Sequence, residues 1–345
     1  MSLTATMMRV HEPGASLVAD RIAVEEPGPR SVRVQVTASG MCHADIGTAA
    51  ATGASTLPVT PGHEVAGAVS AVGSDVAGWQ VGDRVAVGWF GGSCGHCAWC
   101  RRGDVTHCPE RKIPGISYAG GWAESITVPV EALTRVPDGF DLYEAAPMGC
   151  AGVTTFNAVR HSGVPAGGRV AVFGLGGLGH LAVQYAAKMG YDVIAIARGA
   201  AREELARNLG ASEYIDNASG GAGALLREAG GADVIISTAS TTEPVAELTQ
   251  GLRARGRLVV LGADGGSIPV PSGQLVADAQ SITGHITGSP LDIEEAMSFA
   301  LLNGIRPIIE RAPLEEANRE LHRLQNGEPR FRIVLDASAD RAGNA

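Results

Sequence analysis

Four of the six cysteines lie close together in the sequence, as Cys94, Cys97, Cys100 and Cys108. Four thiolates can bind a structural zinc ion tetrahedrally, and C-x2-C spacings present them with little strain in the chain. Disulfides are disfavoured, because such close spacings form poor bridges and the chain shows no secretory signal. An iron–sulfur cluster, which also uses four cysteines, is the smaller alternative. We therefore predict a structural zinc site in a lobe covering about residues 91–110.

The two other cysteines, Cys42 and Cys150, could serve a second metal site together with His63. Three protein ligands and one open position form the usual catalytic zinc site, in which the open position takes water or substrate. His43, Asp45 and Glu64 lie next to these residues in the sequence. The three ligands are far apart along the chain, however, and spacing alone equally allows buried apolar cysteines and a core histidine.

A glycine-rich turn offers a different kind of site. The apolar run 170–173 leads into Gly174, Gly176 and Gly179, and a helical apolar pattern follows to about residue 189. This strand, turn and helix order favours dinucleotide binding, with the pyrophosphate at the helix N-terminus. A glycine-rich turn without a ligand is the alternative. The complete turn consists of Gly174, Leu175, Gly176, Gly177, Leu178 and Gly179.

The end of the next strand indicates which dinucleotide binds. An acidic residue about 20 positions after the glycines normally binds the ribose 2′-hydroxyl of NAD, but here that place holds Ala197, followed by Arg198. Without the carboxylate, a 2′-phosphate is not repelled and Arg198 can pair with it, with Arg202 as a weaker candidate. A solvated surface arginine is the alternative. The sequence therefore predicts a preference for NADP(H).

Composition limits the remaining functions. The formal charge of −9 and the pI near 5.5 argue against a nucleic-acid partner. The chain has neither a signal peptide nor a run of about 18 apolar residues, so we expect a cytoplasmic protein without a membrane partner. An alternative function is that of a zinc-ribbon protein that regulates or binds without catalysing a reaction, but the net negative charge argues against it.

Two regions must position these residues. The first, to about residue 151, reads as β-rich, with a half-buried strand at 32–36 and further strands at 65–72, near Val81 and at 84–87. The second alternates strands and helices, which predicts a six-stranded, doubly wound parallel sheet, the Rossmann arrangement. Its expected strands are 170–173, 193–197, 213–215, 233–237, 258–261 and 282–286, and its expected helices are 179–189, 201–209, 221–229 and 243–254.

The C-terminal part, 292–336, carries two helical patterns and a strand at 331–335, and we expect it to return to the first domain. Residues 337–345 read as a mobile tail. The predicted domains are therefore 1–151 with 288–345, which is the catalytic domain, and 152–287, which binds the dinucleotide.

Several motifs resemble those of the zinc-containing medium-chain alcohol dehydrogenases. They are Gly40-Met-Cys42-His-Ala-Asp45, Gly62-His-Glu64-Val-Ala-Gly67, Val81-Gly-Asp-Arg-Val85, the four-cysteine lobe and the glycine turn, in the same order over nearly the whole chain. Residues 146–155 most resemble the cinnamyl-alcohol-dehydrogenase-like aldehyde reductases. The resemblance implies that the first domain is GroES-like, and that Cys42, His63 and Cys150 bind a catalytic zinc, making two zinc ions per chain. It also implies that Asp45 orients the site, Glu64 lies behind the metal and Thr154 packs on the nicotinamide.

The implied reaction is hydride transfer between NADP(H) and a small primary alcohol or aldehyde, aromatic or allylic substrates included. An NAD-linked secondary-alcohol or polyol dehydrogenase is the alternative. Ala44 replaces the usual Ser or Thr of the proton relay, which leaves water or His43 to move the proton, and Gly288-Ser289-Pro290 lacks a pyrophosphate-binding arginine. Trp89 and Phe90 are either pocket walls or core. The resemblance also implies a homodimer or homotetramer, paired through the last strand of the cofactor domain.

Overall fold

The computed structural model describes residues 3–51, 57–262 and 264–338. The chain forms two compact units, each of which is described by itself. Unit 1 contains Met1–Val153, Thr287–Leu302 and Arg306–Ala345, and unit 2 contains Thr154–Ile286 and Asn303–Ile305. Within the described ranges, no helix is both long and apolar enough to cross a lipid bilayer.

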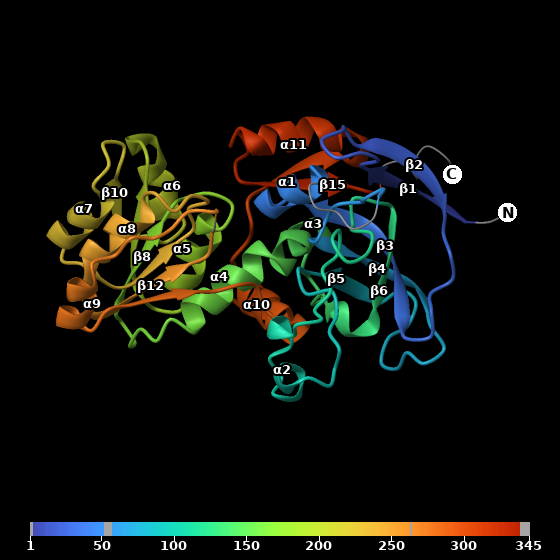
Figure 1. Cartoon of the computed structure of the whole chain (residues 1–345), viewed down its shortest axis with the longest axis horizontal. Helices are drawn as coiled ribbons and strands as arrows, with labels where there is room; N and C mark the ends of the chain where they lie inside the picture. The colour runs from blue at the N-terminus through green and yellow to red at the C-terminus, as the bar shows by residue number, and fades with distance from the viewer. Residues whose placement is uncertain (1–2, 52–56, 263, 339–345) are drawn as a thin grey trace. The chain divides into compact units, whose positions relative to one another are not determined.

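Unit 1 is built on a mostly antiparallel sheet with the order β14-β15-β3-β4-β5-β7, in which β6 also pairs with β3, and on a separate β1-β2 ribbon (Figure 1). The C-terminal segment supplies β14 and β15 to this sheet, next to β3. The strands are β1 (Thr4–Arg9), β2 (Val18–Ala23), β3 (Ser31–Gly40), β4 (Val65–Val72), β5 (Arg84–Val87), β6 (Ser125–Pro129), β7 (Leu133–Arg135), β14 (Ile309–Pro313) and β15 (Arg332–Asp336). The helices are α1 (His43–Ala49), α2 (Ala98–Arg101), α3 (Leu142–Ala145), α10 (Pro290–Asn303) and α11 (Ala317–Gln325). Two of the four boundaries between the units fall within helices, in α4 (Ala151–Arg160) and in α10.

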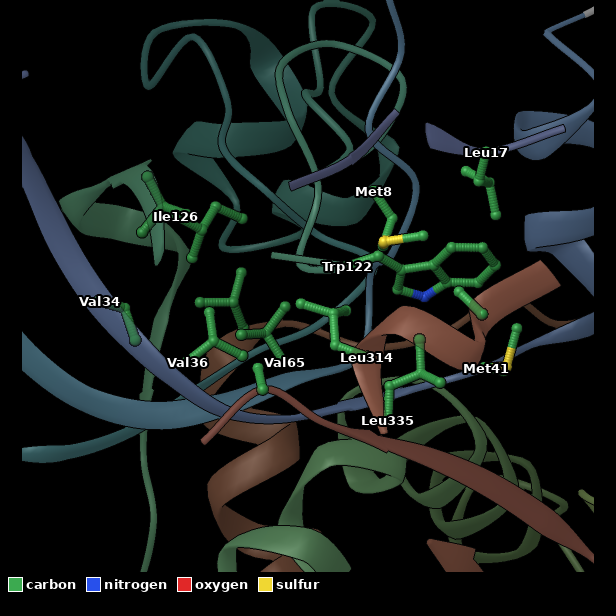
Figure 2. Close-up of a cluster of buried hydrophobic side chains, with 14 of the residues drawn as sticks. Met8, Leu17, Val34, Val36, Met41, Val65, Trp122, Ile126, Leu314 and Leu335 are labelled. Atoms are coloured by element: carbon green, nitrogen blue, oxygen red, sulfur yellow. The ribbon is translucent and has the colours of Figure 1, made fainter. Parts of the chain in front are cut away.

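The core of unit 1 consists of small aliphatic side chains around one large ring. Trp122 is fully buried, and Figure 2 shows its indole among Met8, Met41 and Leu314. Valines of β3 and β4 continue this cluster, as expected for a chain with few aromatic residues. The core therefore fixes the ends of β3 and β4, where candidate site residues follow or precede the strands.

Two expectations about unit 1 need correction. The strand at 32–36 alternates as expected, with its valines buried and Gln35 partly exposed, but Arg33 on the polar face is covered and donates to Ser70 Oγ (3.2 Å) and the Glu25 carbonyl (3.3 Å). Val81 is not in a strand but in an exposed turn, which the Asp83 carboxylate stabilises by accepting from the Gln80 N–H (3.0 Å).

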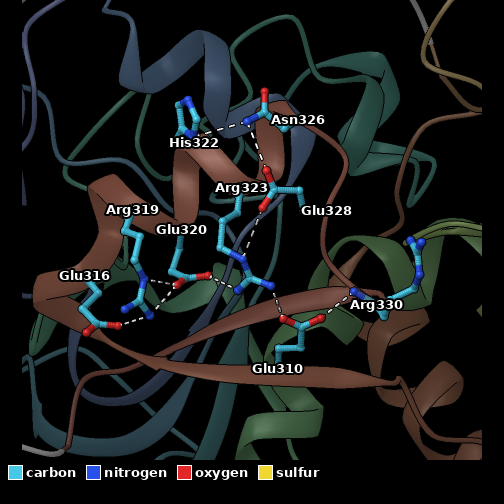
Figure 3. A network of polar contacts seen from close by, with 9 residues as sticks. All are labelled: Glu310, Glu316, Arg319, Glu320, His322, Arg323, Asn326, Glu328 and Arg330. Carbon is cyan, nitrogen blue, oxygen red and sulfur yellow. Dashed lines mark hydrogen bonds and ion pairs between the residues drawn. The ribbon is translucent and has the colours of Figure 1, made fainter.

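A polar network joins α11 to β14 (Figure 3). Glu320 is fully buried and accepts from Arg319 (2.8 Å) and Arg323 (2.6 Å). Arg323 also reaches Glu310 of β14, at 2.6 Å. Because the buried carboxylate has two cationic partners, its charge is compensated, and the network attaches α11 to the sheet edge.

Unit 2 has the predicted six-stranded parallel sheet, in the order β10-β9-β8-β11-β12-β13. Figure 1 shows α5 and α6 on one side of the sheet and α7, α8 and α9 on the other. The strands are β8 (Arg169–Phe173), β9 (Asp192–Ala197), β10 (Glu213–Asp216), β11 (Ala232–Ser237), β12 (Leu252–Val260) and β13 (Ser281–Gly284). The helices are α5 (Gly179–Lys188), α6 (Glu203–Asn208), α7 (Ala222–Glu228), α8 (Val245–Leu248) and α9 (Ser272–Asp278).

The structure also corrects the expected elements in three places. The helix expected at 243–254 ends at Gly251, because Leu252 already pairs with Ala232 as the start of β12. After residue 150, α4, α9 and β14 were not predicted, and several short elements of the first region were not predicted either. Most of the predicted C-terminal tail lies outside the described residues, but Ala337, directly after β15, is buried and donates its N–H to the Thr37 carbonyl of β3 (3.0 Å), so it is held against the sheet.

Candidate functional site

The structure brings Cys42, His63, Glu64 and Cys150 together within unit 1. One ligand atom from each lies within 4.8 Å of all the others. Cys42 follows β3 and precedes α1, His63 and Glu64 immediately precede β4, and Cys150 lies between a 3₁₀ turn, Ala146–Gly149, and α4. The Cys42 and Cys150 sulfurs are 3.9 Å apart and form no disulfide. Two sulfurs, an imidazole and a carboxylate at such distances form a donor set that suits zinc.

Asp45 holds two members of this group in place from the first turn of α1. Its carboxylate is fully buried and accepts from His63 Nδ1 and from the Cys42 backbone N–H, at 2.9 Å each. His63 Nε2 is buried and has no hydrogen-bond partner among the described residues. The nitrogen that faces away from Asp45 therefore has its electron pair available for a cation.

The charges around His63 favour a cation at this place. Burial by itself would lower the pKa of the His63 imidazole, but the Asp45 carboxylate and the Cys42 sulfur raise it well above its ordinary value. Contact with Cys150, together with His63, lowers the pKa of the Cys42 thiol well below its usual range against the effect of burial. The same contact raises the pKa of Cys150. The pair of thiols thus readily supplies one thiolate and resists carrying two without a metal.

Arg332 is a site residue that sequence reasoning missed. At the start of β15 it donates to the Glu64 carboxylate, at 2.6 Å to Oε2, and both side chains are almost completely buried. Burial raises the pKa of Glu64 to about 7, although Arg332 opposes this shift. The ion pair in turn raises the pKa of Arg332 against the effect of burial. The sequence signal for this pair is a single arginine directly before three apolar residues in the predicted strand.

Position 40 must be a glycine because it lies directly against the Glu64 side chain. A Cβ at Gly40 would lie 2.1 Å from Glu64 Oε2, so that any side chain there would displace the Glu64 carboxylate. The Gly40 N–H also donates to the Glu64 carbonyl, at 2.7 Å. The end of β3 therefore leaves space for the carboxylate that contacts Arg332.

The other sequence-predicted residues near this group have different surroundings. His43 is exposed at the start of α1, and Ala44 beside it is also exposed. Trp89 lies edge-on to His63, with ring centroids 4.8 Å apart, and its indole N–H is buried without a partner among the described residues. Phe90 is buried and belongs to the core. Of the two aromatic residues, therefore, Trp89 lies beside the candidate metal ligands.

The four cysteines of the lobe form the second group that could bind a metal ion. The sulfurs of Cys94, Cys97, Cys100 and Cys108 lie within 4.8 Å of one another, and none forms a disulfide. Backbone N–H groups of Cys97 and Cys100 donate to the sulfurs of Cys94 and Cys97, at 3.4 and 3.5 Å. A side-chain contact with Ser93 lowers the pKa of Cys100 to about 6, whereas burial raises that of Cys108 to about 11. Donors to sulfur stabilise thiolates, which is the form that binds metal.

The glycine turn lies between β8 and α5 in unit 2. Gly174 adopts a φ of +92°, and a Cβ at Gly179 would lie 1.8 Å from the Gly174 carbonyl oxygen. A Cβ at Gly176, in contrast, would meet no atom within 4 Å. The first glycine is thus required by the turn and the third by close packing, while the second borders open space that a pyrophosphate could use.

The end of β9 presents a mixture of charges. Ala197 is buried, Arg198 is exposed, and Arg202 donates to the carbonyl of Leu175 in the glycine turn (3.0 Å). Sequence reasoning missed Asp216, which pairs with Ala197 in the neighbouring strand β10. Its carboxylate accepts from the backbone N–H groups of Gly199 (2.7 Å) and Ala218 (2.9 Å). Thr154, the other candidate cofactor residue, is buried in α4.

Two family models match the chain. Residues 28–138 match the alcohol dehydrogenase GroES-like domain, and residues 177–301 match the zinc-binding dehydrogenase domain. Alcohol dehydrogenase patD of Penicillium expansum is 42% identical over 324 residues, covering 94% of this chain and 95% of that protein. NADP-dependent alcohol dehydrogenase C of Mycobacterium bovis is 35% identical over 336 residues, covering 94% and 95% of the two chains.

The fold agrees with these sequence matches. The solved structure of a cinnamyl alcohol dehydrogenase from Sorghum bicolor superposes with a TM-score of 0.89 at 29% identity, covering 97% of this chain and 98% of the other. The predicted fold class, a Rossmann sheet with a GroES-like domain, is confirmed. The chain therefore belongs to the zinc-containing medium-chain alcohol dehydrogenase family and is similar to its cinnamyl-alcohol-dehydrogenase branch.

Proposed function

We propose that this alcohol dehydrogenase is zinc-dependent, prefers NADP(H), and interconverts primary alcohols and aldehydes, aromatic and allylic ones included. In the oxidising direction, an alcohol and NADP⁺ give an aldehyde, NADPH and a proton. The observation that carries the proposal is the buried His63 Nε2, unpartnered among the described residues and grouped with the Cys42 and Cys150 sulfurs.

Cys42, His63 and Cys150 would hold the catalytic zinc, and the four cysteines of the lobe would hold a structural zinc. The residues fit such an ion, because two sulfurs and an unpartnered imidazole nitrogen converge within 4.8 Å. When bound at the first site, zinc supplies Lewis-acid polarisation of the carbonyl oxygen and lowers the pKa of the alcohol. Glu64 is a fourth potential donor in the same group, and Arg332 holds its carboxylate.

The chain's own side chains orient this site. Asp45 keeps the Nδ1 side of His63 occupied, so that Nε2 is the nitrogen left for the metal. Trp89 contributes an apolar ring and a buried N–H beside His63, which suits a substrate with an aromatic body. Ala44 has no hydroxyl to carry a proton, and the proton would therefore move through water or through the exposed His43.

The cofactor preference rests on the end of β9. Ala197 offers no carboxylate to a ribose 2′-hydroxyl, while Arg198 brings an exposed cation to this strand end; Arg202 adds a second cation that is held against the glycine turn. Asp216 is the nearest strand-end carboxylate in register, but two backbone N–H groups donate to its Oδ1. The similarity to an NADP-dependent alcohol dehydrogenase points the same way.

The test combines kinetics with metal analysis. A panel of aromatic and aliphatic aldehydes would be reduced with NADPH and, separately, with NADH, and zinc would be counted per chain. We expect two zinc ions, a larger kcat/KM with NADPH, and turnover of primary aldehydes. A clear NADH preference together with faster oxidation of secondary alcohols or polyols would instead support the alternative dehydrogenase class.

A further inference from the structure

Every carbonyl of the glycine turn from Phe173 to Gly176 lies within hydrogen-bond distance of a side-chain donor. Thr238 Oγ1 is 3.0 Å from the Phe173 oxygen and 3.1 Å from the Gly174 oxygen. Arg202 donates to the Leu175 carbonyl. His180 Nδ1 is 2.9 Å from the Gly176 oxygen. Because a carbonyl oxygen can only accept, Nδ1 of His180 carries the proton and donates.

Gly176 is the carbonyl held most strongly. It accepts from the His180 backbone N–H (3.1 Å) as well as from the His180 ring, so two donors of one residue fix it. The first of these bonds runs along the start of α5, which directs the Gly176 oxygen into the helix. In a trans peptide the next N–H points the opposite way. The Gly177 N–H is therefore aimed out of the helix N-terminus, where an anion binds.

The N–H groups of Gly176 and Gly177 have no acceptor within the part of the chain that the structure describes. They are thus available to a ligand in the open space beside Gly176. His180 itself is fully buried, at a helical position where an apolar side chain would fill the same volume. Among the interactions of this polar ring, the bond from Nδ1 to the Gly176 carbonyl orients the turn.

We propose that His180 is a positioning residue for the pyrophosphate of the dinucleotide, acting through the Gly176–Gly177 peptide without touching the cofactor. This inference rests on the proposed function, because it takes the turn to be the pyrophosphate site. It assigns to the buried ring the task of keeping the Gly177 N–H directed at the phosphates before the cofactor arrives. Losing the ring's bond leaves the Gly176 carbonyl held by the His180 backbone N–H alone, so the peptide is less firmly fixed and the Gly177 N–H is less well oriented toward the phosphate.

Two ligands separate this role from a general effect on the fold. NADPH contains the pyrophosphate, whereas adenosine 2′-monophosphate contains the adenosine and the 2′-phosphate but no 5′-phosphate. We expect His180→Leu to weaken NADPH binding about five- to tenfold, as for one lost hydrogen bond, and to leave adenosine 2′-monophosphate binding unchanged. Dissociation constants would be measured by fluorescence or calorimetry, without substrate.

His180→Asn is the matched control, because its amide nitrogen takes the place of Nδ1 and can still donate to the Gly176 carbonyl. In His180→Gln the amide nitrogen takes the place of Nε2 instead of Nδ1, so it does not restore the bond to Gly176. This glutamine variant is used in place of His180→Leu if the leucine variant does not fold. We expect Asn to bind NADPH like the unmodified protein and Gln or Leu to bind it more weakly. Equal NADPH affinity in all variants, or equal weakening of both ligands, would overturn the role of His180. Failure of the unmodified protein to bind NADPH or NADH would overturn the proposed function as well.

Discussion

Asp45→Asn is the substitution that most directly tests how the buried metal-binding group is held. The change keeps the size of the side chain but removes its charge and one acceptor oxygen. Asp45 accepts two buried hydrogen bonds of 2.9 Å, from His63 Nδ1 and from the Cys42 N–H. The asparagine can accept only one of them, and its NH₂ group then faces the other donor. We therefore expect weaker zinc binding at the Cys42–His63–Cys150 site.

The size of the effect follows from the lost bond. A buried hydrogen bond to a charged group contributes about 1.5–3 kcal/mol, and each 1.4 kcal/mol corresponds to about a tenfold change in affinity. This gives about a 10- to 100-fold loss, the range typical of groups that orient a metal-bound histidine. A matching loss of kcat/KM is expected, because the active fraction falls with zinc occupancy.

The assay is competition for zinc with a chromophoric chelator, followed by counting the zinc retained per chain. The four-cysteine lobe serves as an internal reference, since it should keep its ion in the variant. Asp20→Asn is the matched control, because Asp20 also accepts from a histidine, His11, at 2.8 Å, but that pair is largely exposed. A folded Asp45→Asn protein with unchanged zinc affinity would refute the reasoning.

Four further substitutions test other parts of the site. Ala44→Ser should raise kcat if proton transfer limits the rate, and an unchanged kcat and pH profile would count against a missing relay. Arg332→Met should lower the free energy of unfolding by about 3–5 kcal/mol at pH 8, because it leaves Glu64 buried and unpaired. Since the pKa of Glu64 is already about 7 and would rise further, protonation should make that loss smaller at pH 6, which denaturant unfolding can measure. Arg198→Ala should reduce kcat/KM for NADPH alone, whereas Arg202→Ala should reduce it for NADPH and NADH; the opposite pattern would exchange their roles.

The parallel sheet of unit 2 was predictable because its signals are local. Each strand is a short apolar run, and turn residues and an amphipathic helix follow it, so the order of elements alone indicates the fold. The error at 252–254 has the same origin. Those residues continue a helical pattern locally, and only pairing with Ala232 in a distant strand makes Leu252 the first residue of β12.

The candidate metal site was predictable only in part. Spacing alone indicated the four-cysteine lobe, whereas the choice of Cys42, His63 and Cys150 depended on resemblance to a family. Arg332 could not be found either way, because its partner Glu64 is 268 positions away and the contact exists only once β15 is placed beside β3. Unit 1 joins its two ends through such long-range pairs, which sequence patterns do not record.

Arg202 connects the two parts of the dinucleotide site, which explains why its substitution should differ from that of Arg198. It lies one helical turn beyond the strand end that chooses the cofactor, yet its guanidinium donates to the Leu175 carbonyl inside the glycine turn. Arg198 is exposed at the strand end itself. A cation held against the turn is close to the groups that would receive the pyrophosphate, which NAD and NADP share. The arginine that the structure leaves at the surface is therefore the one better suited to recognise the 2′-phosphate, the group in which the two cofactors differ.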